Sequence, residues 1–281
     1  MRLAADSRGG TPGVVHTGSP RLMCVATHHK AGTVWIKRVM RGIANALDLP
    51  MVGLWSDRHL PKVPATDRAI LVNWEGNFPE QIWVREDVVF LHLIRDPRDI
   101  LLSGCAYHHT APVKGERFLH EPRSDLGGLT YQQHLNALET RDEKLLFEMD
   151  NKHAETVQQM LDWPWGDQRV AELRYEDLIR DTSCELAVKA FRRLGLDGQE
   201  LQTATQIFRD NSLFGGLADS SNRTGRLNDH IASYGKIKRW QTELPRAVGA
   251  VYADRFGEAL IRLGYEHDID WVKTLPEEVS E

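Results

Sequence analysis

Lys30, Gly32 and Thr33 bring a cation, a glycine and a hydroxyl together within four residues, a combination that suits the binding of phosphate or sulfate. An apolar run at 22–26 ends shortly before them, which is typical of a short buried strand. From Val34 the apolar residues recur at steps of three to four positions, as in an amphipathic helix. A strand that turns through glycine into a helix leaves backbone N–H groups unpaired at the positive end of the helix dipole. The segment therefore predicts an anion-binding turn.

A second pair of polar residues also has a spacing that suits an anion. Arg95 directly follows another strand-like run at 88–94, and Ser103 lies eight positions further on. Pro97 suits the first turn of a helix, where its missing N–H costs nothing. The guanidinium and the hydroxyl, about two helical turns apart, can then meet on one anion. The alternative is that Arg95 and Arg98 merely pair with the neighbouring aspartates, a surface contribution of about 0 to 1 kcal/mol.

Both motifs resemble those of the sulfotransferases that use 3′-phosphoadenosine 5′-phosphosulfate (PAPS). The second matches every fixed position of the family's R-[ND]-P-[KR]-D-x-x-x-S motif. The first is not a Walker A loop, because its lysine precedes the turn glycine. It is similar instead to the 5′-phosphosulfate loop, close to T-Y-P-K-S-G-T-T-W, through Thr27, Lys30, Gly32, Thr33 and Trp35. It departs from that loop at His28, His29, Ala31 and Val34.

The resemblance covers about residues 22–265 and implies the P-loop nucleotide-kinase-like fold of that family, with a role for each matching residue. Lys30 would stabilise the leaving phosphate oxygen as a mobile point charge. Arg95 and Ser103 would hold the 3′-phosphate of PAPS and of its product, 3′-phosphoadenosine 5′-phosphate (PAP). The aromatic residues expected near the adenine are Trp35, Tyr175 and Phe208. The loop residues expected to bind the 5′-phosphosulfate beside Lys30 are Ala31, Gly32, Thr33 and Val34.

Near the C-terminus the resemblance weakens. Family members carry R-x-G-x-x-G-x-W, whose arginine and neighbouring backbone close over the 3′-phosphate. Here Gly235 and Trp240 match, but Ser233 takes the place of the arginine. Either another basic residue supplies the charge and the segment 223–240 folds over the cofactor, or the 3′-phosphate is bound less tightly. The basic residues available are Lys236, Lys238, Arg223 and Arg226.

Sulfuryl transfer to a hydroxyl or an amine needs a base for the proton of the acceptor, but no metal in principle. Family members use a histidine or a glutamate after the strand that precedes 88–94. Glu75 is the residue at that place which can take up a proton, so it is the expected base. His108 and His109 are the alternatives. The loop histidines, which could help to hold phosphate, are His28 and His29.

Two other function classes stay open. A kinase-like phosphotransferase is one, although the absence of a Walker A loop argues against it. A non-catalytic nucleotide-binding member is the other, suggested by the lost arginine and opposed by the retained Lys30. The acceptor is expected to bind among residues 50–85 and 110–165. The tryptophans expected to form its walls are Trp55, Trp74, Trp83, Trp163 and Trp165.

The composition agrees with one enzyme domain. The chain has 281 residues, of which 41% are hydrophobic, enough for a single large core. Residues 1–20 predict a flexible tail, and 21–281 a sulfotransferase domain that is compatible with a homodimer. The net charge of −5 gives no reason to expect nucleic acid, and no apolar stretch approaches 18 residues, so no membrane contact is expected. Three scattered cysteines predict reduced thiols, a cytoplasmic location and no zinc site.

Four strand-like runs must position the chemical groups: 22–27, 69–74, 88–94 and 169–174. They alternate with helical patterns, which predicts an α/β fold with a central parallel sheet flanked by helices. Ligands of such sheets bind at the carboxyl ends of the strands. The sequence therefore predicts one shared site for the four residues that lie just past those ends: Lys30, Glu75, Arg95 and Tyr175.

Overall fold

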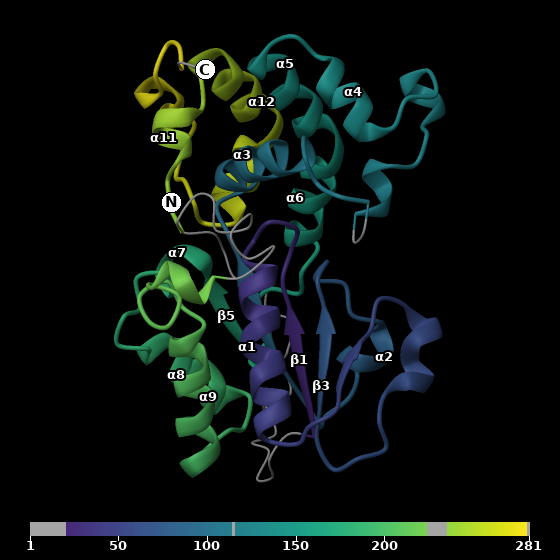
Figure 1. Cartoon of the computed structure of the whole chain (residues 1–281), viewed down its shortest axis with the longest axis vertical. Helices are drawn as coiled ribbons and strands as arrows, with labels where there is room; N and C mark the ends of the chain where they lie inside the picture. Colours follow the sequence, from purple (N-terminus) through teal and green to yellow (C-terminus); the bar gives the residue numbers. More distant parts are fainter. Residues whose placement is uncertain (1–20, 114–115, 224–234, 280–281) are drawn as a thin grey trace, which may run out of the picture.

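Five parallel strands form the central sheet of the computed structural model (Figure 1), in the order β2–β3–β1–β4–β5. The structure describes residues 21–113, 116–223 and 235–279, so the tail expected at 1–20 lies outside the described residues. The predicted α/β class and parallel sheet are confirmed. The strands are β1 (Leu22–Ala26), β2 (Met51–Gly53), β3 (Ala69–Asn73), β4 (Val88–Ile94) and β5 (Val170–Arg174).

Strand β2 is the element of the sheet that the sequence did not predict. The other four strands agree with the predicted runs to within one residue at each end. β2 has three half-buried residues and lies at an edge of the sheet, where Met51 pairs with Ile70 and Gly53 with Val72 of β3. Three residues carry no periodicity of their own, so pairing with β3 decides their conformation.

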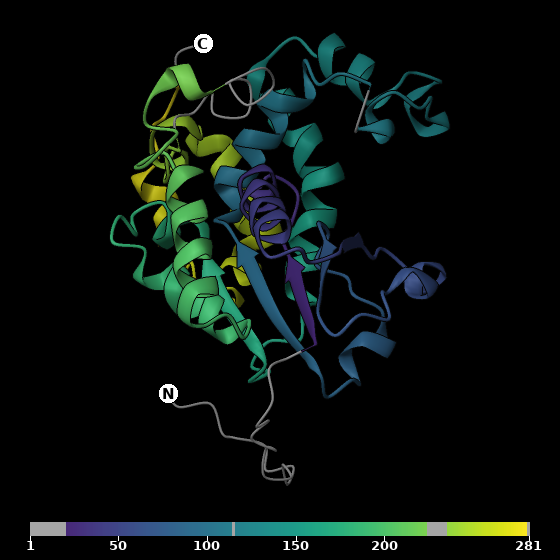
Figure 2. The same ribbon diagram turned by 60° about the horizontal axis from the view of Figure 1, so that its bottom comes forward.

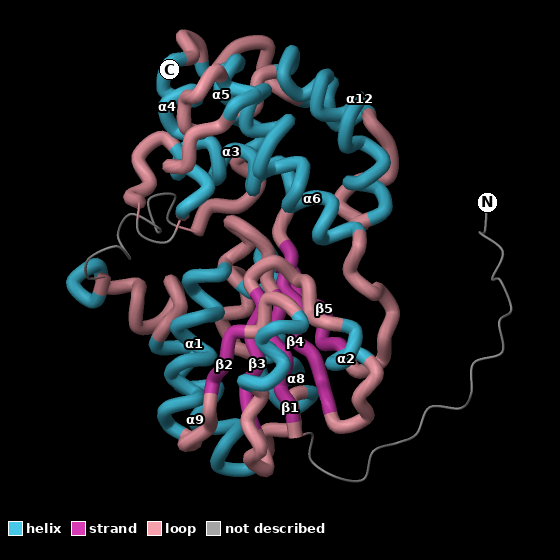
Figure 3. The backbone as a smooth tube through the Cα atoms, turned by 90° about the vertical axis from the view of Figure 1, so that its right-hand side faces the viewer, coloured by secondary structure: helices cyan, strands magenta, loops and turns pink. Residues whose placement is uncertain are grey.

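Helices cover both faces of the sheet. Met23 and Val25 of β1 face α1 (Thr33–Ala46), α8 (Glu185–Arg193) and α9 (Gly198–Asp210). Leu22 and Cys24 face the opposite layer, which contains α2 (Glu80–Trp83). Figure 2 shows α1 in front of the strands, and Figure 3 shows α1 and α9 on one side with α2 on the other. Because both faces are covered, every residue of β1 and β3 is buried.

A second group of helices lies beyond the carboxyl ends of the strands and has a core of its own (Figures 1 and 3). We call this group the helical layer. Leu101 and Leu102 lie in that core, together with Tyr252 and Trp271. The helices of the layer are α3 (Pro97–His108), α4 (Tyr131–Ala137), α5 (Arg141–Glu148), α6 (Ala154–Leu161), α11 (Trp240–Glu243) and α12 (Arg246–Arg262).

Local sequence signals explain where these helices begin. Pro97 occupies the first turn of α3, as predicted, and the side chain of Asp96 accepts from the N–H of Arg98 as the N-cap. Thr130 and Thr140 form capping boxes at the starts of α4 and α5. A π-helical turn, η4 (Met149–His153), then joins α5 to α6 across a kink, because Asn151 within it has a non-helical φ of −118° and ψ of −114°. Glu148 ends α5 before the kink, and Lys152 follows it.

The remaining elements are short. They are α7 (Tyr175–Leu178) and the 3₁₀ turns η1 (Asp57–Lys62), η2 (Arg117–Leu119), η3 (Ser124–Leu126), η5 (Ser220–Asn222) and η6 (Asp270–Thr274). Within the described ranges, no helix combines the length and the apolar character that crossing a bilayer requires.

Candidate active site

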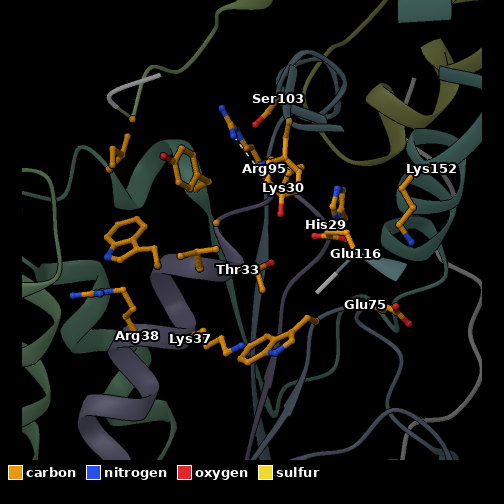
Figure 4. A pocket seen from close by; sticks show the side chains of 18 of the residues that line it. His29, Lys30, Thr33, Lys37, Arg38, Glu75, Arg95, Ser103, Glu116 and Lys152 are labelled. Atoms are coloured by element: carbon orange, nitrogen blue, oxygen red, sulfur yellow. Dashed lines mark hydrogen bonds between the residues drawn. The ribbon is translucent and has the colours of Figure 1, made fainter. Parts of the chain in front are cut away.

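A cavity of about 680 Å³ lies between the carboxyl ends of the strands and the helical layer (Figure 4). Lys30, Glu75, Arg95 and Tyr175 all line it, although each follows a different strand. The four residues that the strand pattern predicted to share a site are therefore together. Six Lys or Arg side chains and two carboxylates line the cavity, so its charge favours an anionic ligand.

The loop between β1 and α1 is shaped around Gly32, whose φ of 102° belongs to the left-handed region. A Cβ at this position would lie 3.0 Å from Cδ2 of Tyr175, so a glycine is required both by conformation and by space. The hydroxyl of Thr33 donates to the carbonyl of His28 at 2.9 Å and closes the turn. No side chain caps α1, so the N–H groups of its first turn are open to a ligand.

Lys30 is half-buried at the centre of this loop, with a φ of 57°. Its Nζ lies 3.9 Å from the ring centroid of Tyr107, a cation–π contact from α3. Burial, followed by the charge of Arg95, lowers the pKa of Lys30 to about 8. An anion in the cavity would reverse the second effect, because a negative charge favours the protonated amine.

Arg95 and Ser103 both line the cavity near Lys30 (Figure 4). The guanidinium of Arg95 donates to the carbonyl of Lys30 at 3.2 Å and lies 3.8 Å from the carboxylate of Asp99. Its Nε is buried and has no hydrogen-bond partner among the described residues. The eight-residue spacing that the sequence singled out therefore places a guanidinium and a hydroxyl at one cavity wall.

Local pairing, the alternative for this segment, is present at both arginines, but Arg95 also lines the cavity whereas Arg98 does not. Arg98 is 1% exposed and its NH2 lies 2.8 Å from Asp96. It also lies 2.5 Å from Glu266 and 3.5 Å from the ring centroid of Trp240. This arrangement is a buried cluster that joins α3 to the C-terminal helices, and it differs from the surface pair that the sequence suggested.

Three aromatic residues were expected near an adenine, and two of them line the cavity. Trp35 and Tyr175 meet edge to face, with ring centroids 6.0 Å apart. Phe208 is buried at 2% exposure and does not line the cavity. It stacks on Trp35 at 5.2 Å and so supports that ring from behind. Of the expected acceptor walls, Trp55 and Trp74 line the cavity, whereas Trp83, Trp163 and Trp165 do not.

The C-terminal segment reaches the cavity through its backbone. Gly235 lines the cavity, while Lys236 is exposed and its carbonyl accepts from Arg95 at 3.4 Å. Asp99 accepts from the N–H of Lys238 at 2.8 Å and of Trp240 at 3.1 Å, which ties this turn to α3. Two residues that the sequence considered, Arg226 and Ser233, lie outside the described residues.

The candidate bases lie in different places. Glu75 lines the cavity with an exposed side chain. His108 is fully buried and does not line the cavity. His109 does not line it either, and its Nδ1 lies 2.6 Å from Oδ1 of Asn136. His29 does line the cavity, next to Lys30.

Sequence reasoning missed other basic residues of the wall. Lys37 and Arg38 lie four positions after Thr33 and Val34, so they share a helix face with the start of α1, and that spacing could have identified them. Two further residues, from 110–165, carry no comparable local signal: Arg117 and Lys152.

No protein-family model and no curated protein matches the sequence. Several solved structures match the fold. A structure of mouse sulfotransferase SULT7A1 complexed with PAP is 16% identical, with a TM-score of 0.56 over 86% of this chain and 85% of that chain. Retinol dehydratase in complex with androsterone and inactive cofactor PAP is 15% identical, with a TM-score of 0.51 over 85% of this chain and 80% of that chain. Retinol dehydratase in a complex with retinol and PAP is 15% identical, with a TM-score of 0.51 over 86% of this chain and 81% of that chain. The chain therefore has the sulfotransferase fold.

Proposed function

We propose that this protein transfers a sulfuryl group from PAPS to a hydroxyl or an amine of an acceptor. The observation that carries the proposal is the meeting of Lys30, Arg95 and Ser103 in one cavity, beside the uncapped start of α1. Each of these groups donates hydrogen bonds to phosphate or sulfate oxygens. The likeness to three structures that contain PAP supports extending this ligand to the present chain.

Unpaired buried donors support a bound nucleotide. Nε of Arg95 and Nε1 of Trp35 are buried without a partner among the described residues, and both side chains line the cavity. An unpaired buried donor costs about 1 to 3 kcal/mol, which an accepting ligand offsets. The excess of basic side chains in the wall is also consistent with a ligand that carries several phosphate charges.

The proposed roles follow from chemistry and position. Lys30 stabilises the charge that develops on the leaving phosphate, and the N–H groups at the start of α1 hold the phosphosulfate. Arg95 and Ser103 hold the 3′-phosphate, which distinguishes PAP from an ordinary adenosine 5′-phosphate. Trp35 and Tyr175 contact the adenine. PAPS itself supplies the activated sulfuryl group.

The acceptor side of the cavity carries the base. Glu75 is the base expected from the sequence, and its exposed carboxylate at the wall is compatible with that role. His108 is the alternative, but it contacts an acceptor only through another group, because it is buried behind the wall. The cavity residues from 50–85 and 110–165 that surround the acceptor are Trp55, Trp74, Glu75, Glu116, Arg117, Phe118 and Lys152.

Nucleotide-dependent stabilisation tests the cofactor. A ligand at 100 times its Kd raises the free energy of unfolding by about 2.7 kcal/mol. We expect PAP to raise the melting temperature and adenosine 5′-phosphate to raise it much less. Equal stabilisation by the two nucleotides would contradict the 3′-phosphate site. Stabilisation by ATP together with phosphate transfer would favour the kinase-like alternative.

Transfer of labelled sulfate from PAPS to a panel of alcohols, phenols and amines tests the reaction. We expect Lys30→Ala to lower turnover by roughly 100-fold or more, since it removes a partner of the charge in the transition state. The folded state, followed by circular dichroism, should be unchanged. PAP binding without transfer to any acceptor would favour the non-catalytic alternative.

A further inference from the structure

A chain of hydrogen bonds runs from the cavity into the helical layer. His29 lies in the wall beside Lys30 (Figure 4), and its Nε2 lies 2.9 Å from Nε2 of His108. Nδ1 of His108 lies 2.7 Å from Oε2 of Glu148, and the hydroxyl of Tyr131 donates to the same oxygen at 2.7 Å. His108, Glu148 and Tyr131 are at most 1% exposed, so His29 is the end of the chain that meets the cavity.

The carboxylate at the inner end decides which ring nitrogens carry protons. A carboxylate only accepts, so His108 donates its Nδ1–H to Glu148 and keeps Nε2 as an acceptor. His29 must then donate its Nε2–H to His108, which leaves Nδ1 of His29 unprotonated. None of the residues that the structure describes hydrogen-bonds this Nδ1. The chain thus presents an imidazole lone pair at the end that meets the cavity.

We propose that His29 is the general base that takes the proton of the acceptor, and that His108, Glu148 and Tyr131 are positioning residues that set its tautomer. This assignment rests on the proposed sulfuryl transfer and identifies the base of that same site. His29 is a catalytic residue because its ring lines the cavity beside Lys30. His108 acts only through His29.

The proton and electron balance of the step is complete. A lone pair of the acceptor oxygen or nitrogen forms the new bond to sulfur, while the S–O bond to the 5′-phosphate breaks and its electron pair goes to the phosphate oxygen. Nδ1 of His29 takes the proton of the acceptor. The Nε2 proton of His29 can then pass to Nε2 of His108, whose positive charge the carboxylate of Glu148 stabilises. Lys30 stabilises the phosphate oxygen.

Burial and the positive groups around His29 favour its neutral form, and Glu116 is the carboxylate that opposes them. Lys30 lies in the same loop, Lys152 comes from η4, and Glu116 lies beside the ring (Figure 4). Burial, and then the charges of His108, Lys30 and Lys152, hold the pKa of His29 well below its ordinary value. The ring is therefore neutral near pH 7 and able to accept a proton.

The expected base, Glu75, has no comparable support. Its side chain is exposed, and its backbone N–H donates to Oδ1 of Asn73 at 2.9 Å. That hydrogen bond holds the backbone after β3, and no residue in the described ranges is hydrogen-bonded to the carboxylate. A base works best when a second group holds it in the reactive orientation, and in this wall His29 meets that condition.

The neighbouring residue, His28, begins a matched chain that provides a control. Nε2 of His28 lies 2.8 Å from Nε2 of His92, and Nδ1 of His92 lies 2.6 Å from Oε2 of Glu172. His28 is fully buried and does not line the cavity. Glu172→Gln is therefore the matched control for Glu148→Gln, because each replaces the carboxylate at the end of a His–His–Glu chain.

Nitrogen NMR of the imidazole rings tests the proposal in the free protein, without an acceptor. We expect Nδ1 of His29 to be unprotonated in the wild type. In Glu148→Gln it should become partly protonated, because a neutral amide can donate as well as accept and no longer fixes the Nδ1–H tautomer of His108 as a carboxylate does. Glu172→Gln should leave His29 unchanged. A protonated Nδ1 in the wild type would overturn the proposal, even if Glu148→Gln does not fold.

Two phenols of similar shape but different acidity test the role in the reaction. With 4-methylphenol as acceptor, we expect His29→Gln to lower turnover by roughly 100-fold or more, with PAP binding unchanged. With 4-nitrophenol, ionised at about pH 8.5, the loss should be far smaller, because a phenolate has no proton to give up. Glu172→Gln, which lies outside the cavity wall, should retain turnover near that of the wild type.

The outcomes separate this proposal from the one on which it rests. Wild-type turnover in His29→Gln, or a loss confined to Glu75→Gln, would overturn the assignment of His29 while leaving sulfuryl transfer intact. A wild type that neither binds PAP nor transfers sulfate would overturn the proposed function instead. In that case the tautomer of His29 remains measurable by NMR.

Discussion

His28 and His29 are neighbours in the sequence, and each begins a His–His–Glu chain, but the two chains lie in different layers. The chain from His29 enters the helical layer through α3 and the end of α5. The chain from His28 stays within the sheet, through His92 of β4 and Glu172 of β5. We call them the cavity chain and the sheet chain. Adjacent residues can reach different layers here because the chain turns between β1 and α1, where the N–H of Ala31 donates to the carbonyl of His28 at 3.0 Å.

The two chains are oriented in opposite senses. In the cavity chain the carboxylate is buried and the last imidazole meets the cavity. In the sheet chain Glu172 is exposed, and the last imidazole, His28, is enclosed, with Nδ1 lacking a partner among the described residues. A Cβ on Gly76 would lie only 2.3 Å from Cε1 of His28. The same three residue types therefore position a base in one chain and fill the core in the other.

The largest effect is expected when two residues of the cavity chain are changed together. His29→Gln alone should lower turnover by about 100- to 10,000-fold, the usual range for a general base. Adding Glu148→Gln should lower it little further, because Glu148 acts through His29 and residues that act as a unit are not additive. Adding Glu172→Gln to His29→Gln should lower turnover only by the same small factor that Glu172→Gln has in the wild type. Labelled-sulfate turnover of the wild type, the three single variants and the two double variants measures this, and multiplicative losses for His29 and Glu148 would break the comparison.

The next effect concerns the enclosed end of the sheet chain. Gly76→Ala must displace His28, and Gly76 also has a φ of 67°. Gly127→Ala is a matched control, since Gly127 has a φ of 63° and open space around its Cβ position. We expect Gly76→Ala to lower the free energy of unfolding by about 1 to 3 kcal/mol more than Gly127→Ala does. Urea denaturation measures both, and equal costs would mean that His28 is not tightly enclosed.

A moderate effect is expected from the lysine beside the cavity chain. The pKa of Lys30 is about 8 in the free protein, and a bound phosphate raises it, so binding of PAP takes up a proton above that pH. The Kd of PAP should therefore rise with pH above 8, by up to about tenfold per pH unit. Lys30→Arg should remove this dependence because arginine stays charged. Calorimetry measures the Kd of PAP across pH in the wild type and in Lys30→Arg. The same dependence of Kd on pH in both proteins would exclude Lys30 as the source of the dependence.

The smallest effect is expected at the exposed end of the sheet chain, the carboxyl group of Glu172. Partial burial raises the pKa of Glu172 to about 7. Since the ordinary pKa of a glutamate is lower, the folded state binds more protons than the unfolded state between about pH 4.5 and 7. This contribution to stability falls as the pH rises through that window and is constant above it. Glu172→Gln should flatten the slope in thermal melts, and an unchanged slope would assign it to another group.

Much of the cavity could be predicted because its chemistry is tied to strand ends. Lys30 and Arg95 follow two strands whose apolar runs are evident from the sequence, and the parallel sheet brings their carboxyl ends to one edge. Pro97 indicated the start of α3, which placed Ser103 correctly on the cavity wall. These inferences needed neighbours in the chain and one general rule of sheet topology.

Other positions depend on contacts that are not local. Phe208 has the right type for an adenine site, but its position on α9 places it behind Trp35. Lys236 contributes a backbone carbonyl to Arg95 while its side chain is exposed. Both positions depend on the orientation in which a helix or a turn packs against α1 and α3. The residue type at one position does not indicate that orientation.

The sequence by itself determined the α/β class, the strand-to-helix turn at Lys30 and the placement of Arg95 and Ser103 about two helical turns apart on one cavity wall, because local periodicity and short spacing encode them. Only the tertiary structure decided which of two adjacent histidines meets the cavity. His29 lies 79 positions from His108, and His108 lies 40 positions from Glu148. Contacts at such separations form when the helical layer packs onto the ends of the strands, and the burial of Glu148 in that packing then sets the protonation of a ring in the cavity wall.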